Sequence, residues 1–219
     1  MIVLGVDPGS RFTGYAIVEQ RKSQFHLIEG GVIATVSSSK SSPKYQLDIP
    51  QRLLIIHTEL AEIIDRHNPV SAAIESIFSY KSSEAAIRLG QARGVALMTL
   101  AQKGLSVEAY NPMTVKKSVG GHGQAGKDEI IRITSKLLHL QSPLSSDAAD
   151  AAAIAITHII RSTLQSRFYQ HHDPNINSNL TPNQKKLAEL KKNITKGNTS
   201  RTSRTKGNNL QDWLNHRPK

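Results

Sequence analysis

The sequence of 219 residues predicts an α/β protein with a mixed five-stranded sheet and helices packed on the faces of that sheet. Two observations predict this class. Three short apolar segments separated by turns open the chain, and segments of helical periodicity then alternate with short apolar runs. Hydrophobic residues make up 38% of the chain, which is enough to build one sizeable core.

The first three strands are expected at residues 2–6, 13–18 and 25–36. The first run, IVLGV, stops at Asp7-Pro8-Gly9, because proline and glycine favour a turn there. Another turn is expected at Glu29-Gly30-Gly31, between or within the second and third strands. Three consecutive strands joined by short turns indicate an antiparallel meander.

Residues 51–110 are expected to alternate between helix and strand. Leucine and isoleucine recur on one side of the segment 51–67, which predicts a helix. A short apolar strand at 70–74 leads to a long helix at 82–103, whose small residues permit close packing, and a fifth strand follows at 105–110. Strands separated by helices complete the mixed sheet.

Three further helices are expected after the fifth strand, at 112–120, 127–138 and 145–164. Pro112 is suited to the first turn of a helix, and Gly120-Gly121 is suited to its end. After about residue 170 the chain becomes polar, and it is expected to be disordered over 195–209. We therefore expect a folded domain at 1–168 and a basic, low-complexity C-terminal extension at 169–219.

The net charge of +11 is concentrated near the C-terminus, where residues 183–219 hold ten lysines and arginines against two acids. A polyanionic partner is therefore expected. The sequence contains no cysteine, which excludes disulfides, zinc–thiolate sites and a cysteine nucleophile. No N-terminal signal peptide is recognisable and no apolar run is long enough to span a bilayer, so we expect a soluble, cytoplasmic protein without membrane contact.

The most informative segment is SSDAADAAAIAITH, at residues 145–158, because it places two acids at the start of an otherwise apolar helix. Asp147 and Asp150 are three residues apart and share one helix face. A helix cap followed by a first-turn acid would explain them structurally. Partly buried carboxylates also need a compensating partner, and a divalent cation is a natural one. His158 lies about 16 Å further along the helix axis and is expected to be a packing or surface residue.

Two further acids stand at the ends of predicted strands, Asp7 after the first strand and Glu75 after the fourth. Functional groups of α/β sheets gather at strand ends and at the adjacent helix termini. Each acid alone has a structural explanation as a turn or strand-end residue. Together with Asp147 and Asp150 they favour a site for a hard cation with oxygen ligands, such as Mg²⁺.

Such a site predicts phosphodiester hydrolysis. Two Mg²⁺ ions about 4 Å apart can activate a water and stabilise a leaving alkoxide on opposite sides of a phosphorus. Asp7 is expected to bridge both ions. The substitution Asp7→Asn is therefore expected to abolish cleavage and to leave DNA binding in place.

Four segments carry a resemblance to a known family: VDPGSRFTGYAIV (6–18), AIESIF (73–78), LGQARGVA (89–96) and DAADAAAIAITH (147–158). In order and spacing they resemble the Holliday-junction resolvases of the RuvC family. The resemblance implies a ribonuclease-H-like fold, a homodimer, and Mg²⁺-dependent endonuclease activity that makes paired symmetric nicks in four-way DNA junctions during recombination and repair. It also implies 5′-phosphate and 3′-hydroxyl ends, two Mg²⁺ ions per site with Mn²⁺ able to substitute, and work beside the RuvA–RuvB branch-migration complex.

The resemblance also assigns roles to single residues. Phe78 is expected to stack on unpaired junction bases, with ordinary core packing as the alternative. Lys116 and Lys127 match basic residues that contact DNA near the scissile phosphate, where Lys127 is expected to assist catalysis. Arg11, in the turn after Asp7, is expected to contact phosphate. The acidic tetrad of the family falls on Asp7, Glu75, Asp147 and Asp150.

Three other interpretations are open. Another ribonuclease-H-like nuclease, acting on RNA–DNA hybrids or other branched DNA, would share the fold and the metal site. A non-catalytic nucleic-acid-binding module would use the basic extension, although four carboxylates repel DNA unless a metal screens them. An actin-like ATPase would need a second glycine-rich phosphate turn, for which 219 residues leave no room. Ser76 and Lys81 depart from the RuvC pattern, so the preferred cleavage sequence is not predicted.

Overall fold

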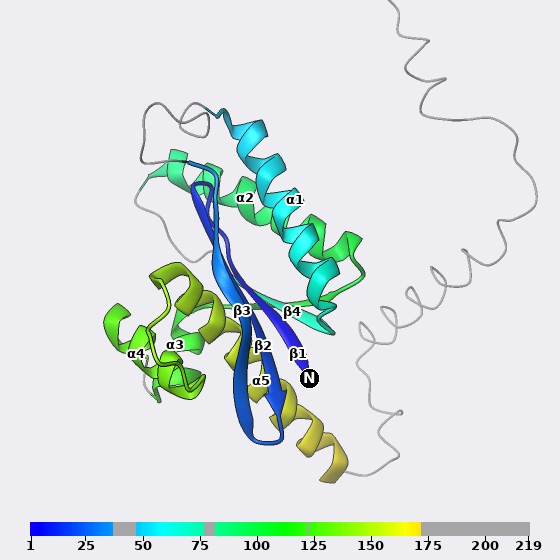
Figure 1. Cartoon of the computed structure of the whole chain (residues 1–219), viewed down its shortest axis with the longest axis vertical. Coiled ribbons are helices and arrows are strands. Elements are labelled where there is room, and N and C mark those ends of the chain that lie inside the picture. The colour runs from blue at the N-terminus through cyan, green and yellow to red at the C-terminus, as the bar shows by residue number, and fades with distance from the viewer. Residues whose placement is uncertain (37–46, 77–81, 122, 172–219) are drawn as a thin grey trace, which may run out of the picture. The chain divides into compact units, whose positions relative to one another are not determined.

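Five strands form one sheet in the order β3-β2-β1-β4-β5 in the computed structural model, which describes residues 1–36, 47–76, 82–121 and 123–171 (Figure 1). β1 pairs antiparallel with β2 and parallel with β4, so the meander and the parallel part of the sheet meet at β1. This arrangement confirms the predicted mixed five-stranded sheet. The strands are β1 (Ile2–Asp7), β2 (Phe12–Arg21), β3 (Gln24–Ala34), β4 (Ser71–Glu75) and β5 (Ser106–Tyr110).

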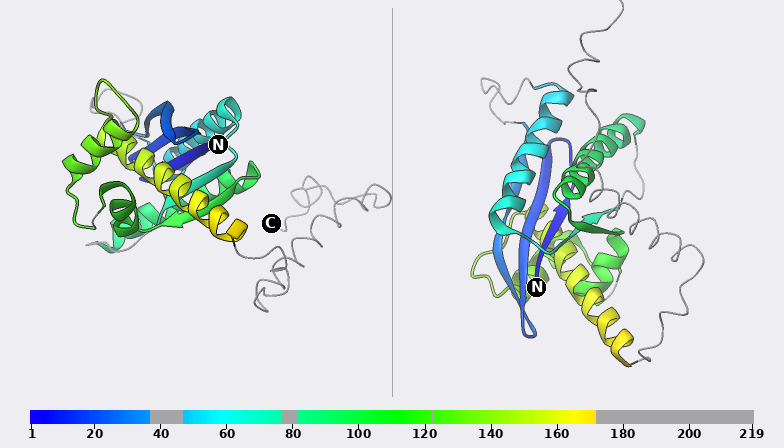
Figure 2. Two further views of the ribbon diagram at one scale, coloured as in Figure 1. Left: turned by 90° about the horizontal axis from the view of Figure 1, so that it is seen from below. Right: turned by 90° about the vertical axis from the view of Figure 1, so that its right-hand side faces the viewer.

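The helices α1 (Ile49–His67) and α2 (Ser83–Gln102) cover one face of the sheet (Figures 1 and 2). α1 begins after Asp48, whose side chain accepts a hydrogen bond from the backbone N–H of Gln51. Apolar side chains of both helices pack against β1 and β4 and form the larger part of the core. The buried residues of this layer are Leu4, Val6, Ile17, Ile33, Ile56, Leu60, Ile63, Ile64, Ala72, Ile74, Ala92, Ala96 and Leu100.

The helices α3 (Pro112–Gly120), α4 (Lys127–Leu137) and α5 (Ser146–His171) lie on the opposite face of the sheet (Figure 2). α5 approaches the sheet very closely, because glycines of the strands face it. A Cβ atom on Gly5 would overlap the main-chain oxygen of Ala151, and one on Gly14 would overlap that of Asp147. This contact brings the acidic start of α5 beside the end of β1. The buried alanines of α5 are Ala148, Ala149, Ala151, Ala152, Ala153 and Ala155.

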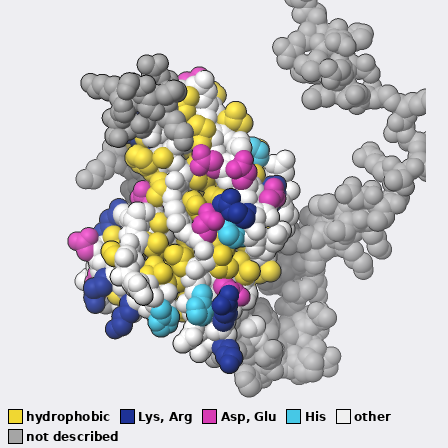
Figure 3. Space-filling view, in the orientation of Figure 1, with side chains coloured by type: hydrophobic (Ala, Val, Ile, Leu, Met, Phe, Trp, Pro, Cys, Tyr) yellow, Lys and Arg dark blue, Asp and Glu magenta, His cyan; other side chains and the backbone are white. Residues whose placement is uncertain are grey.

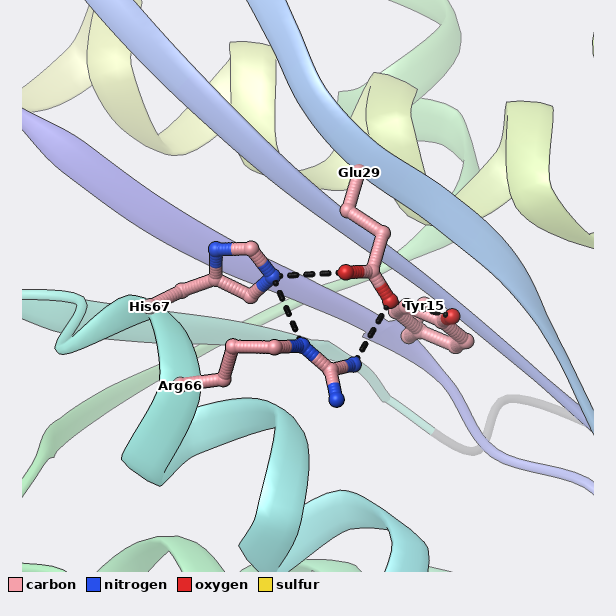
Figure 4. A network of polar contacts seen from close by, with 4 residues as sticks. All are labelled: Tyr15, Glu29, Arg66 and His67. Carbon is pink, nitrogen blue, oxygen red and sulfur yellow. Dashed lines mark hydrogen bonds and ion pairs between the residues drawn. The ribbon is translucent and has the colours of Figure 1, made fainter.

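A polar network joins β2, β3 and the end of α1 (Figure 4). Glu29 accepts hydrogen bonds from the Tyr15 hydroxyl at 2.8 Å and from the Arg66 guanidinium at 2.9 Å, and His67 Nε2 lies 2.7 Å from its second oxygen. Burial works to raise the pKa of Glu29, but these three partners outweigh it and lower that pKa to about 2. The network therefore fastens the meander to α1, and it contains none of the predicted site residues.

The elements differ from the expected ones in two places. Glu29, Gly30 and Gly31 pair with β2 as part of β3, where a turn between or within the strands was expected, and a bulge in the pairing falls at Ile17 and Val18. A bulge interrupts the regular alternation of side chains between the two faces of the sheet, so the strand is harder to recognise in the sequence. α5 continues to His171, beyond the expected end at residue 164.

The chain divides into the units Met1–Arg167 and Phe168–Lys219, and the candidate site lies in the first. Residues 172–219 lie outside the described ones, so the domain boundary at 168 and the disorder of the extension stay predictions. None of the described helices is long and apolar enough to cross a membrane.

Candidate active site

The four predicted acids lie at one end of the sheet, on the side covered by α5. Asp7 ends β1 and Glu75 ends β4, and these two strands are parallel neighbours with Val6 opposite Ile74. Asp147 and Asp150 lie in the first two turns of α5, which the glycine contacts hold against β1 and β2. All four carboxylates are half-buried.

Asp7 and Glu75 form a hydrogen-bonded pair of carboxyl groups. Burial raises the pKa of Asp7 to about 8, and the negative charges of Glu75, Asp150 and Asp147 raise it further in that order. Burial also raises the pKa of Glu75 and the charge of Asp150 adds to this effect, whereas the hydrogen bond with Asp7 opposes it. In the absence of a cation the pair therefore favours sharing a proton over full ionisation, because two half-buried carboxylates at hydrogen-bonding distance repel each other when both are charged.

Asp150 faces two lysines across a small cavity. Glu75, Lys116, Lys127 and Asp150 line this cavity, which has a volume of about 200 Å³. Burial and the charge of Asp147 raise the pKa of Asp150, whereas Lys127 and Lys116 act in the opposite direction. The structure thus brings both predicted lysines to the carboxylates, on the side where a phosphate would need compensating charge.

The lysines are placed by the ends of two helices. Asn111 caps α3 by accepting a hydrogen bond from the backbone N–H of Thr114 at 2.8 Å, and α3 ends at Gly121 in the left-handed conformation. Lys116 lies within that helix and is half-buried. Lys127 is the first residue of α4 and is exposed.

Asp147 faces a second cavity, of about 430 Å³, on the other side of the turn after β1. Arg11, Phe12 and Arg88 line this cavity together with Asp147. Arg11 is exposed and lies on the far side of the acids from Lys116 and Lys127. Basic side chains therefore line both cavities, and in the second one Arg88 is paired with Glu84, which also lines that cavity.

Two residues that support the acids were not recognised in the sequence. The Arg93 guanidinium on α2 donates a hydrogen bond to the main-chain oxygen of Glu75 at 2.9 Å. The Thr13 hydroxyl donates to the main-chain oxygen of Gly9 at 2.8 Å and closes the turn that follows Asp7. Both bonds go to main-chain atoms, and side-chain types alone do not reveal such bonds. Arg93 does lie within the segment LGQARGVA, which was a signal that its side chain has a role.

The donor set suits a hard divalent cation, because it consists of carboxylate oxygens, which are the ligands that such ions prefer. Among the described residues, no three His, Asp or Glu side chains converge closely enough to hold an ion as they stand. Asp7 is engaged by Glu75, and Asp147 lines a separate cavity. That the four acids together hold a metal ion stays a prediction.

Two other sequence predictions concern aromatic and histidine side chains. Phe78 lies outside the described residues, so its stacking role stays a prediction. His158 is a packing residue, as expected: its Nε2 lies 3.1 Å from the Ser71 hydroxyl and its Nδ1 lies 3.0 Å from the Tyr110 hydroxyl.

Comparisons with known proteins identify the family of the chain. Residues 3–158 match the family model of the crossover junction endodeoxyribonuclease RuvC. RuvC of Solidesulfovibrio magneticus is 40% identical over 158 residues, which span 72% of this chain and 89% of that protein. RuvC of Caldicellulosiruptor saccharolyticus is 42% identical over 175 residues, which span 79% of this chain and 99% of that protein.

The fold agrees as well. The structure of Thermus thermophilus RuvC in complex with a Holliday junction substrate superposes with a TM-score of 0.68 at 34% identity, covering 75% of this chain and 96% of that one. The yeast mitochondrial Holliday junction resolvase shares the fold with a TM-score of 0.58 at 15% identity. The sheet is thus of the ribonuclease-H-like type. The chain belongs to the RuvC family of crossover junction endodeoxyribonucleases, the hydrolases that resolve four-way DNA junctions.

Proposed function

We propose that Asp7, Glu75, Asp147 and Asp150 hold two Mg²⁺ ions, with Mn²⁺ able to substitute, and that the enzyme makes paired symmetric nicks that leave 5′-phosphate and 3′-hydroxyl ends. The observation that carries this proposal is the placement of four half-buried carboxylates at one end of the sheet, at the ends of the parallel strands β1 and β4 and at the start of α5. When bound, the ions supply activation of a water and stabilisation of the departing 3′ oxygen.

The chain's own residues bind and orient the phosphate. Lys116 and Lys127 face Asp150 across the small cavity, and in our proposal they hold the scissile phosphate and offset the charge that develops on it. Arg11 binds a neighbouring phosphate on the side of Asp147. Phe78, just after β4, stacks on an unpaired base at the branch point.

Basic side chains extend the DNA-binding surface from the cavity across α3 and α4. Figure 3 shows Lys and Arg side chains over the part of the molecule where Figure 1 places these helices. Contacts of this kind with the phosphate backbone give affinity without reading sequence. The basic residues of the two helices are Lys116, Lys117, Lys127, Arg132 and Lys136.

A homodimer would supply two active sites, one for each nick. The helix α2 offers a candidate surface for dimer formation. Ile87 and Met98 are 63% and 54% exposed on α2, which is unusual for large apolar side chains. Gly90 and Gly94 lie between them with open space where a Cβ would be. The four positions share one helix face, and we propose that this face, the α2 stripe, packs against its copy in the partner. On family membership alone we also propose work beside RuvA–RuvB, in the cytoplasm.

Cleavage of a synthetic four-way junction in Mg²⁺ tests the catalytic assignment. The wild-type chain is expected to make symmetric paired nicks in the junction, and to leave linear duplex and an RNA–DNA hybrid intact. Asp7→Asn and Asp150→Asn are expected to lower the cleavage rate by at least roughly 10³-fold while the junction still binds. Asp48→Asn, which removes the same charge at the cap of α1, serves as the matched control and is expected to cleave normally.

The other outcomes are equally informative. Cleavage retained by Asp7→Asn would remove this residue from the catalytic set. Nicks in the hybrid in place of the junction would keep the metal chemistry and discard the proposed substrate preference. The substitution Lys127→Ala is expected to lower the rate constant for cleavage of the bound junction by about 10²-fold, since the scissile phosphate would lose an adjacent positive charge.

A further inference from the structure

A groove lies outside the catalytic site, between the edge strand of the sheet and α5. It has a volume of about 680 Å³, which exceeds the volumes of both cavities beside the carboxylates. None of the four acids lines it. Its walls are formed by the last residues of β5, the start of α3 and the second half of α5, with Glu108, Ala109, Tyr110, His158, Arg161 and Gln165 among the lining residues.

The wall formed by β5 offers unpaired backbone groups. β5 is the edge strand, and no described residue pairs with its outer side. The backbone N–H of Ser76 donates to the main-chain oxygen of Tyr110 at 2.8 Å, so Tyr110 turns its backbone groups toward β4. Because this direction alternates along a strand in a parallel pair, Ala109 turns its N–H and C=O away from β4, into the groove. Ala109 is exposed.

The opposite wall is one face of α5. His158, Arg161, Ser162 and Gln165 follow the spacing that places side chains on a single helix face. His158 forms a fixed floor between the walls, because both of its ring nitrogens are engaged by the hydroxyls of Ser71 and Tyr110. A groove with a strand edge on one side and a helix face on the other has the shape that accepts an extended chain.

The charged side chains in the groove indicate which charge a bound extended segment would carry. The Arg161 guanidinium lies 5.9 Å from the centre of the Tyr110 ring, which holds it over the groove. Arg161 has no carboxylate within ion-pair distance in the part of the chain that the structure describes. Glu108 lies on the strand, on the same face as Tyr110, and would repel an acidic ligand placed directly over it.

We propose that this groove binds an extended segment of a partner protein, which adds to β5 as a sixth strand and places an Asp or Glu side chain on Arg161. The main-chain hydrogen bonds to Ala109 give the affinity, and the ion pair with Arg161 gives the preference for an acidic segment. Tyr110 lies opposite Glu75 in the sheet register, so the bound segment sits one strand away from a catalytic strand.

Selection from a phage-displayed library of random heptapeptides, with the full-length protein as bait, tests the proposal. The expected peptides alternate β-branched and polar residues and carry one acid. A synthetic copy of the strongest peptide is expected to bind roughly tenfold more weakly to Arg161→Glu and to Ala109→Pro. Ala109→Pro removes only an outward N–H, which an edge strand tolerates. Glu108→Gln is expected to bind the same peptide at least as tightly as wild type.

Junction cleavage by the same variants separates this proposal from the catalytic one, because none of the three residues belongs to the site of the acids. All three variants are expected to cleave at the wild-type rate. The proposal is overturned if no peptide is enriched, or if the enriched peptides bind Arg161→Glu and Ala109→Pro as tightly as wild type. It is also overturned if junction DNA competes with the peptide for the groove, or if Ala109→Pro converts a dimer into a monomer, since DNA or a second copy would then be the occupant.

Discussion

At the scale of the residue, the most consequential feature is the proton shared by Asp7 and Glu75. The raised pKa of Asp7 means that the folded chain keeps this proton up to about pH 8, whereas the unfolded chain loses it near pH 4. Between these values the unfolded state binds fewer protons than the folded state. The free energy of unfolding of the metal-free protein therefore falls as pH rises through this window.

Asp7→Asn is expected to stabilise the metal-free protein while it abolishes cleavage. The amide carries no charge and can still hydrogen-bond to Glu75, so the gain is expected to reach about 1–3 kcal/mol at pH 8 and to vanish near pH 4. Thermal unfolding in a chelating buffer at several pH values measures this. Asp48→Asn controls for the loss of one negative charge elsewhere, and an equal gain in both variants would show that net charge, not the pair, is responsible.

The positions of the four acids could be predicted from the sequence, because each stands at or near the boundary of an element and carries the chemistry itself. Lys116 and Lys127 were expected from the family resemblance, and the fold places both beside Asp150. Arg93 and Thr13 could not be predicted, because they act on main-chain oxygens that only the fold places within reach. The groove at Ala109 could not be predicted for the same reason, because Ala109 offers its backbone N–H and C=O groups there and not its side chain.

Arg93→Lys is expected to lower the cleavage rate constant about tenfold with little change in junction binding, because the Glu75 carbonyl loses its partner and the carboxylate becomes less well positioned. Single-turnover cleavage at saturating enzyme measures the rate constant separately from binding. Arg52→Lys is the matched control. Arg52 lies on α1, and its guanidinium donates the same kind of hydrogen bond to the main-chain oxygen of Leu47, just before that helix. Loss of binding in Arg93→Lys would assign Arg93 to DNA contact instead.

At the scale of the element, the position of the acids depends on how closely α5 can approach the sheet. Helix and strand types could be read from periodicity, and the glycines in β1 and β2 were visible in the sequence. The contact of Gly5 with Ala151, and of Gly14 with Asp147, required the sheet order and the register to be known. The expected turn at Glu29-Gly30-Gly31 was wrong for a related reason, since those residues continue β3 through a bulged pairing with β2.

Gly14→Ala is expected to reduce cleavage strongly, because the new methyl group would push the start of α5 away from β2 and with it the Asp147 carboxylate. The accompanying loss of stability is expected to be about 1–3 kcal/mol. Cleavage assays and denaturant unfolding measure the two effects. Gly30→Ala, on β3, is the control for the added methyl group and is expected to leave cleavage unchanged, because its Cβ would meet mainly the flexible end of the Leu27 side chain.

At the scale of the whole molecule, the α2 stripe predicts the assembly state. Sedimentation equilibrium is expected to give twice the chain mass of 24.0 kDa for wild type, and the chain mass for Gly94→Arg, in which a long charged side chain replaces the open position. Val70→Arg changes an equally exposed apolar residue outside α2 and is expected to stay dimeric. A dimer that persists in Gly94→Arg would place the interface on another surface.

The shared proton also links magnesium binding to pH. An ion that binds to Asp7 and Glu75 must displace the proton, so the apparent magnesium affinity rises with pH and roughly one proton is released per site. Calorimetric titrations in buffers of different ionisation enthalpy would register that release directly. Acidification and magnesium depletion are therefore expected to act in the same direction at this site, since each favours the protonated pair without the ion.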